Sequence, residues 1–223
     1  AVHLFTPTGG FGMNTGVGDA ENLGWKLAAW HDGWSGEKLV ASYQGERRPV
    51  AIRNLAQSYA LAQDKSALSV PPNIEDETPE GARVRAEFGK RTEEALAEEY
   101  FCMGIQLGGR YDASPLVSVD GEAGPPPVSD PYVYTATAYP GGRAPHVWLS
   151  DGSALFDNFG PGFTLLRLGG DADGAEFVAA AAAVGVPLSV FDATEESLRD
   201  LYEADLAIIR PDQYVAWRGD TLP

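Results

Sequence analysis

The residues of this sequence that could bind a ligand lie in a glycine-rich segment near its start, residues 6–16. Glycine has no Cβ atom, so a ligand can approach the backbone there closely, and Pro7 fixes one φ angle at the entry. The first amides of a helix are unpaired and carry partial positive charge, which suits an anion or a ring carbonyl that gains negative charge. The candidate ligand-binding residues are Pro7, Gly9, Gly10, Gly12, Met13 and Asn14.

A helix must position these amides, and we expect it over residues 14–31. Leu23, Leu27 and Trp30 follow the i, i+4, i+7 spacing of an apolar helical face. Asn14 or Thr15 has the side chain of an N-cap residue. On the glycine spacing alone, a plain glycine-rich turn before a surface helix is an equal alternative.

The longer string is more specific than its glycines. It resembles the second flavin-binding motif of FAD-dependent aromatic hydroxylases, which are single-component flavoprotein monooxygenases of the phenol hydroxylase and dichlorophenol hydroxylase type. The matching residues are Ala1-Val2-His3-Leu4-Phe5-Thr6-Pro7-Thr8-Gly9-Gly10-Phe11-Gly12-Met13-Asn14-Thr15-Gly16, Asp19-Ala20, Asn22-Leu23 and Trp25-Lys26-Leu27-Ala28.

The resemblance implies FAD as the cofactor, NAD(P)H as a co-substrate and a phenolic or polycyclic aromatic substrate. It also implies that residues near Pro7 lie at the reacting edge of the flavin, that residues 9–12 let its ring lie flat against backbone, and that the amides of Met13 and Asn14 face its electron-rich end. Because the reactive groups belong to the cofactor, we assign no catalytic acid or base. Arg47 and Arg48, in a stretch that the family shares, are expected to be solvated or paired with acids.

Three parts are predicted along the chain: residues 1–65 as the end of an FAD-binding domain, 66–98 as a linker and helix, and 99–223 as a second domain. We expect a helix over 37–64 that kinks or restarts at Pro49, because proline lacks a backbone donor. Residues 66–81 are rich in proline and acidic residues and show no helical or strand periodicity, so we expect a loop or linker there. Residues 80–98 read as a charged helix with a thin apolar stripe.

The last part alternates between strand-like and helix-like segments. Strands are expected at 100–107, 133–139, 146–149, 163–168 and 187–191, helices at 174–184 and 194–202, and an antiparallel hairpin at 206–209 and 214–217. Strands separated by helices favour a parallel core, to which the hairpin adds an antiparallel edge. The predicted fold class is therefore α/β: a helical remnant of an FAD-binding domain followed by a thioredoxin-like α/β domain.

The same part resembles the C-terminal domain of the hydroxylases named above. The matching segments are 145–149, 157–160, 163–166 and 209–218. The resemblance implies that this domain packs against the flavin domain and contributes to contacts in a homodimer.

Composition excludes several other classes of function. The net charge of -16 argues against nucleic acid and against an anionic membrane surface. Cys102 is the single cysteine, so dithiol exchange is not possible within the chain and a cytoplasmic location is the default. His3, His31 and His146 lack the spacing of metal ligands, so no metal site is predicted. No membrane span and no signal peptide are expected.

Two expected family features are not found in these residues. A Gly-Asp pair normally stands just before the equivalent of Ala1, and the Gly-x-Gly-x-x-Gly fingerprint for the ADP half of the cofactor does not occur. We therefore expect the C-terminal portion of a longer hydroxylase, which by itself binds FAD poorly and has no turnover. The alternative is a non-catalytic thioredoxin-like interaction or dimerisation module with a leftover helical arm.

Overall fold

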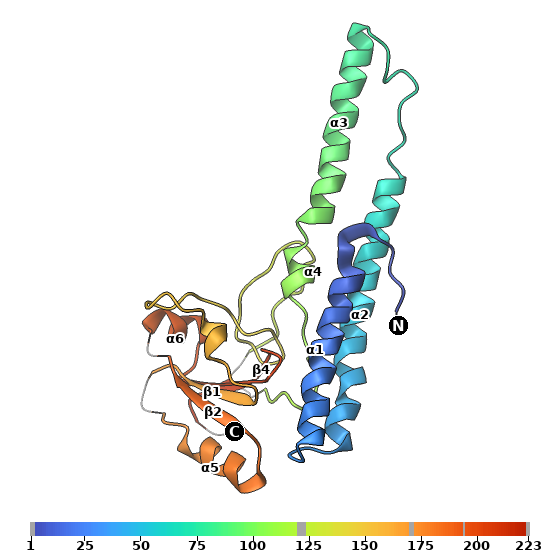
Figure 1. Cartoon of the computed structure of the whole chain (residues 1–223). Coiled ribbons are helices and arrows are strands. Elements are labelled where there is room, and N and C mark those ends of the chain that lie inside the picture. Colours follow the sequence, from blue (N-terminus) through green and yellow to red (C-terminus); the bar gives the residue numbers. More distant parts are fainter. Residues whose placement is uncertain (1–2, 120–123, 170–171, 194, 222–223) are drawn as a thin grey trace.

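The computed structural model describes residues 3–119, 124–169, 172–193 and 195–221. Long helices come first in the chain, and a mixed sheet with two short helices comes last (Figure 1). This arrangement confirms the predicted α/β class. Within the described ranges, no helix combines the length and the apolar character that a bilayer span requires.

Two helices that lie side by side form the centre of the helical part (Figure 1). α1 spans Phe11–His31, α2 spans Glu37–Ser66, and a short 3-10 helix, η1 (Thr8–Gly10), directly precedes α1. α2 continues through Pro49, so the predicted restart there is wrong. Proline removes a single hydrogen bond from the helix, and packing of α2 along α1 offsets that loss.

α3 (Pro79–Tyr100) extends beyond the rest of the molecule as an arm beside the end of α2 (Figure 1). Its start follows from the sequence, because Thr78 caps it and Pro79 occupies the first helical position. The amide of Gly81 donates to Thr78 Oγ1 at 3.0 Å. This helix agrees with the charged helix predicted over residues 80–98.

α4 (Met103–Leu107) lies where we predicted a strand, so that prediction is wrong. The spacing of apolar residues in such a short run does not distinguish a buried strand from a buried helix. The fold decides the outcome: Cys102 and Ile105, three positions apart, face the same apolar cluster as Phe11 and Leu61.

The C-terminal sheet contains β1 (Phe163–Arg167), β2 (Leu188–Asp192), β3 (Leu206–Ile209) and β4 (Val215–Gly219), in the order β2-β1-β3-β4. β1 pairs in parallel with β2 and antiparallel with β3, and β3 pairs antiparallel with β4. α5 (Ala175–Val184) joins β1 to β2, and α6 (Glu196–Tyr202) joins β2 to β3. This is the predicted thioredoxin-like arrangement, including its antiparallel closing hairpin.

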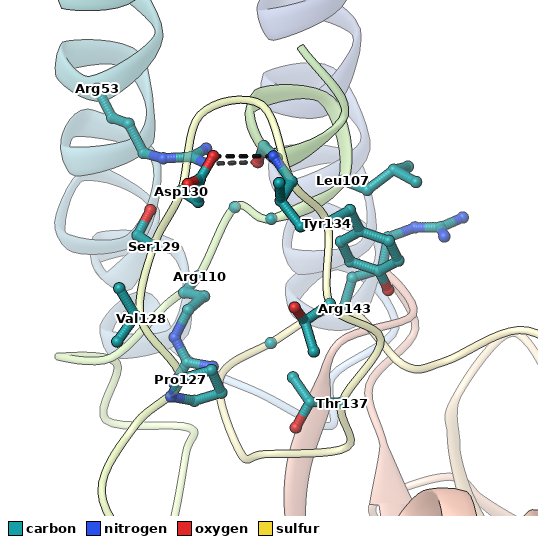
Figure 2. A pocket seen from close by; sticks show the side chains of 16 residues that line it. Arg53, Leu107, Arg110, Pro127, Val128, Ser129, Asp130, Tyr134, Thr137 and Arg143 are labelled. Carbon is teal, nitrogen blue, oxygen red and sulfur yellow. Dashed lines mark hydrogen bonds between the residues drawn. The ribbon is translucent and has the colours of Figure 1, made fainter. Parts of the chain in front are cut away.

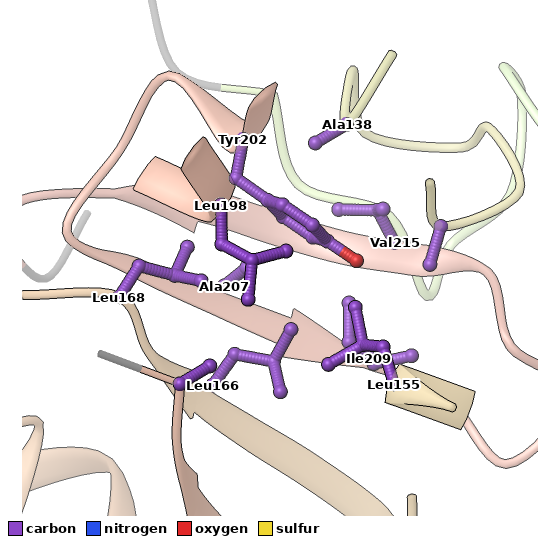
Figure 3. Close-up of a cluster of buried hydrophobic side chains, with 11 residues drawn as sticks. Ala138, Leu155, Leu166, Leu168, Leu198, Tyr202, Ala207, Ile209 and Val215 are labelled. Carbon is purple, nitrogen blue, oxygen red and sulfur yellow. The ribbon is translucent and has the colours of Figure 1, made fainter. Parts of the chain in front are cut away.

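Both faces of the sheet are covered by apolar packing. Figure 3 shows the larger cluster, in which residues of α6 and of loops close over one face. Its buried members are Ala138, Ala144, Leu155, Leu166, Leu168, Ala193, Leu198, Tyr202, Ala207, Ile209 and Val215. On the other face Leu165, Leu206 and Trp217 pack with Phe177 of α5. The sheet therefore forms a core of its own.

Residues 133–139 and 146–149 are not strands, contrary to our prediction. They run as loops over the sheet domain, with only isolated bridges in this region, such as Arg143 with Tyr214 and Trp148 with Ala154. A strand needs a continuous partner, and the alternating pattern of these residues does not supply one. The short 3-10 helix η2 (Leu155–Asn158) follows them.

Candidate functional site

The glycine-rich loop forms a tight turn that delivers the chain into α1. The Gly10 amide donates to the Pro7 carbonyl oxygen at 3.2 Å. Gly9 and Gly10 have φ angles of 80° and 65°, which L-residues with a Cβ atom rarely adopt. These two glycines are therefore required by the turn itself.

α1 begins at Phe11, three residues before the predicted start, and Gly10 is its N-cap. Neither Asn14 nor Thr15 caps the helix, because Asn14 lies inside it and its Nδ2 donates to the Gly10 carbonyl oxygen at 3.0 Å. In a helix with this start, the amides of Phe11, Gly12 and Met13 lack partners within the helix, and the Asn14 amide is the first to have one. The available donors thus begin two positions earlier than the Met13 and Asn14 pair that we expected, and they include Met13 but not Asn14.

The three loop glycines differ in what lies beside them. A Cβ atom on Gly9 would come within 2.5 Å of the Phe11 ring, and one on Gly12 would lie 3.2 Å from Phe5 Cβ. Beside Gly10 there is no atom within 4 Å of that position. Among the glycines, Gly10 therefore offers an open backbone surface to a ligand. The other candidate residues Pro7, Met13 and Asn14 are also exposed.

Two side chains from distant parts of the sequence hold this loop. Ser58 Oγ on α2 lies 2.6 Å from Thr6 Oγ1 and donates to the Thr8 carbonyl oxygen at 3.0 Å. Glu99 Oε1 on α3 accepts a hydrogen bond from the Gly9 amide at 3.1 Å. Sequence reasoning missed Ser58 and Glu99, because no local pattern connects them to the loop.

Glu99 is itself fixed by a charged neighbour. Lys65 Nζ donates to Glu99 Oε2 at 2.9 Å. The hydrogen bond from Lys65, followed by that from the Gly9 amide, lowers the pKa of the Glu99 carboxyl. The carboxylate therefore stays ionised at neutral pH while it holds Gly9.

A buried cluster of charges joins the helices to the sheet domain. Glu46 of α2 accepts hydrogen bonds from both terminal nitrogens of Arg210, each at 2.8 Å, and Asp212 accepts from Arg210 Nε at 2.9 Å. Burial alone would raise the pKa of Glu46, but its bonds with Arg210, Lys26 and Ser114 outweigh that effect and hold it at about 2. Glu46 is thus ionised, and its charge is paired.

α1 contributes polar side chains to this cluster. Lys26 Nζ donates to Glu46 Oε2 at 2.6 Å, and Asn22 Nδ2 donates to Glu46 Oε2 at 2.8 Å and to Asp212 Oδ2 at 2.9 Å. Leu27 and Trp30, which we placed on the buried face, are exposed instead. The predicted apolar face is wrong because the buried side of α1 is occupied by paired polar groups.

Arg47 is paired with an acid, as expected, but it is buried rather than solvated. Its Nε donates to Asp19 Oδ1 at 2.8 Å and its Nη1 donates to Tyr111 at 3.0 Å. His3 Nε2 lies 2.7 Å from the other Asp19 oxygen. The neighbouring Arg48 remains exposed.

Three hollows lie near these groups. One of about 480 Å³ is bounded by α1, α2, residues 105–109 and the loop after β3, and Gly9, Phe11 and Asn14 are among the residues that line it. Another of about 820 Å³ lies between residues 3–4 and α2. A third, of about 40 Å³, lies beside Arg53 and Arg110 (Figure 2). Since a water molecule needs roughly 10–15 Å³ of cavity, this third hollow is too small for an aromatic ring.

The described residues give little support for metal binding or for catalysis by a thiol. In the described ranges, no group of three or more His, Cys, Asp or Glu side chains is arranged to hold a metal ion. Cys102 is buried, its Sγ donates to the Glu98 carbonyl oxygen, and burial raises the pKa of its thiol. A buried thiol of this kind is a poor nucleophile.

Fold and site together define an α/β protein with a glycine loop at a helix start and an attached thioredoxin-like domain. Comparisons with known proteins agree with this description. Residues 1–58 match the family model of an FAD binding domain, and residues 137–223 match the model of the aromatic-ring hydroxylase C-terminal domain.

Individual relatives cover almost the whole chain. An FAD-dependent monooxygenase (opdD) of Penicillium oxalicum is 36% identical over 99% of this chain and 43% of its own length. Phenol 2-monooxygenase of a Pseudomonas species is 27% identical over 100% of this chain and 42% of its own. The rebeccamycin biosynthetic enzyme RebC, solved with reduced flavin, is 41% identical with a TM-score of 0.88, over 99% of this chain and 41% of its own.

These matches confirm the resemblance to the FAD-dependent aromatic hydroxylases that was found in the sequence. The chain spans about two fifths of the length of the relatives that it matches.

Proposed function

We propose that this chain supplies the C-terminal portion of an FAD-dependent, NAD(P)H-consuming monooxygenase that hydroxylates a phenolic or polycyclic aromatic substrate. The observation that carries the proposal is the loop geometry, in which the open backbone at Gly10 leads directly into the free amides of α1. The match of residues 1–58 to an FAD binding domain supports it.

The loop fits a flat, electron-rich ring. When bound, a flavin accepts hydride from a nicotinamide and activates dioxygen for transfer to the aromatic substrate. The amides of Phe11, Gly12 and Met13 would stabilise negative charge on the pyrimidine end of the ring, with help from the α1 dipole. Because they are already fixed, they need no reorganisation when that charge develops.

The proposed cofactor-binding residues remain Pro7, Gly9, Gly10, Gly12, Met13 and Asn14, to which the structure adds the Phe11 amide. Their roles differ: Gly10 offers the open surface, whereas Gly9 is needed for the turn. Ser58 and Glu99 hold the loop through its backbone at Thr8 and Gly9.

The division into residues 1–65, 66–98 and 99–223 also remains a proposal, as do a cytoplasmic location and a homodimer.

Another part of the flavin domain, upstream in the relatives, is the proposed partner of the helices. Its support is the apolar surface of α1 and α2. The exposed apolar residues there are Met13, Val17, Leu27, Trp30, Ile52, Leu55 and Tyr59.

Flavin titration tests the proposal. We expect the 223-residue chain to bind FAD weakly, and a longer protein that includes the upstream flavin domain to be yellow and to oxidise NAD(P)H faster when a phenol is added. Gly10→Ala in the longer protein should weaken flavin binding. A longer protein without flavin and without phenol-stimulated oxidation would refute the proposal and favour a non-catalytic thioredoxin-like interaction or dimerisation module.

A further inference from the structure

The arm formed by α3 (Figure 1) carries a shallow groove of about 580 Å³ along its surface. All the residues that line this groove belong to α3, apart from Phe101, which follows the helix directly. Tyr100 is 70% exposed and Phe101 is 69% exposed. Gly89 forms the floor of the groove, since no atom lies within 4 Å of the position that a Cβ atom would take there. Apolar side chains exposed together in this way mark a surface that binds a partner.

The charges of α3 are divided between its two halves. Residues 79–91 contain four bases and two acids, a net charge of +2, whereas residues 92–100 contain four acids and no base, a net charge of -4. A helix dipole favours the opposite order, because acids stabilise the start of a helix and bases stabilise its end. The last turn of α3 contains no base. The division of charge therefore does not stabilise α3 as an isolated helix.

A second copy of α3 that runs antiparallel to the first complements this division. Each basic half then lies beside the acidic half of the other helix, and each helix end lies beside a dipole of opposite sign. A parallel pair would instead place like charges together. Two identical chains form an antiparallel helix pair through a two-fold axis, which closes the assembly at two copies.

The groove also fixes the register of such a pair. Gly89 and Leu96 are seven positions apart and therefore lie on the same face of α3. With the two-fold axis at the level of residues 92 and 93, Leu96 of each copy lies over the open backbone at Gly89 of the other. Lys90 and Glu93, three positions apart, share one flank of the helix, and both are exposed. The two-fold axis brings Lys90 of one copy beside Glu93 of the other.

We propose that α3 is the contact surface of a homodimer in which the arms of two copies pair antiparallel over the groove at Gly89. The charges of α3 complement themselves, so a second copy is the occupant that this surface specifies. The inference gives the homodimer proposed above a contact surface in the helical part of the chain, outside the C-terminal domain, and it requires no flavin.

Sedimentation velocity of the 223-residue protein tests the proposal. We expect a monomer–dimer equilibrium with a dissociation constant of about 1–100 µM at low salt. Dimerisation should weaken as the salt concentration rises from about 0.05 to 0.5 M, because the charges on the arm are exposed. A protein that stays monomeric at about 500 µM and low salt would overturn the proposal and leave the groove to the upstream flavin domain.

A glycine substitution locates the contact without weakening the helix. Gly89→Glu puts a better helix former into α3, but it places a carboxylate in the groove, so we expect dimerisation to weaken about tenfold or more. Gly45→Glu is the matched control, because Gly45 is an exposed glycine inside α2 that also has no atom within 4 Å of its Cβ position. Dimerisation that Gly89→Glu leaves intact, or that Gly45→Glu weakens equally, contradicts the assignment.

Charge reversal tests the antiparallel register. Lys90→Glu sets two acids against each other across the dimer and Glu93→Lys sets two bases, so each variant alone should dimerise about tenfold more weakly. An equal mixture of the two variants should recover dimerisation as a heterodimer, and so should the double variant. Two variants that dimerise like the wild type, or a mixture that gives no recovery, would refute the pairing of the arms. Failure of flavin binding in a longer protein would refute the proposed function without affecting this result.

Discussion

The carboxylate of Glu46 on α2 and the guanidinium of Arg210, 164 positions later, form a bidentate pair with both N···O distances at 2.8 Å. Both side chains are fully buried. A bidentate pair fixes orientation as well as distance, so this contact sets how the loop after β3 lies against α1 and α2. The same loop ends at Tyr214, which lines the cavity beside the glycine loop.

Glu46→Gln should destabilise the protein strongly. The substitution keeps the shape but leaves Arg210 and Lys26 buried without their shared carboxylate, and breaking a buried ion pair costs about 3–5 kcal/mol. Urea denaturation measures this loss. Glu80→Gln is the control, since its pair with Arg83 is exposed and should contribute nothing measurable. A change in Glu46→Gln as small as that in the control would contradict a role for the cluster in stability.

The contribution of Glu46 should depend on pH. Its pKa in the folded protein is about 2, below the ordinary value of 4.5, so between these values the unfolded state binds more protons. The stabilisation is therefore complete above pH 4.5 and is lost as pH falls toward 2. We expect the difference in unfolding free energy between wild type and Glu46→Gln to shrink over that interval. A difference that stays constant with pH would show that folding does not shift the pKa of this carboxyl.

Gly9→Ala should cost more stability than Gly10→Ala. Both glycines have positive φ angles, for which a residue with Cβ pays about 1–2 kcal/mol. At Gly9 the new methyl group would also overlap the Phe11 ring at 2.5 Å, whereas at Gly10 it would enter open space. Thermal or urea unfolding of the two variants checks the order. Equal losses would mean that the Phe11 ring moves aside without cost.

Glu99→Ala should free the Gly9 amide. We expect that amide to exchange with solvent about tenfold faster, because a hydrogen bond to a charged acceptor is lost. Glu99→Gln should exchange at an intermediate rate, since its side-chain oxygen can still accept from Gly9 but no longer attracts Lys65 by charge. Hydrogen exchange followed by NMR separates the three proteins. Unchanged exchange in Glu99→Ala would exclude Glu99 as a clamp of the loop.

The sequence alone determined the class of fold and the location of the proposed cofactor loop. Amphipathic and apolar patterns over residues 163–217 were enough to predict a thioredoxin-like sheet, because each of those strands and helices is set by its own residues and turns. The string around Gly9 and Gly10 likewise showed the resemblance to the hydroxylases, because a turn that presents its backbone to a ligand needs particular residues at particular positions.

Only the tertiary structure decided which faces and partners these elements use. α1 buries Asn22 and Lys26 rather than Leu27, because a carboxylate from α2 and a loop from the sheet domain meet there. Residues 103–107 fold as a helix because this conformation packs Ile105 against the apolar cluster of Phe11 and Leu61. Ser58 and Glu99 contact the loop although they lie 50 and 90 positions away from it in the sequence. The packing of the helices brings these residues together, and no local sequence pattern predicts such a contact.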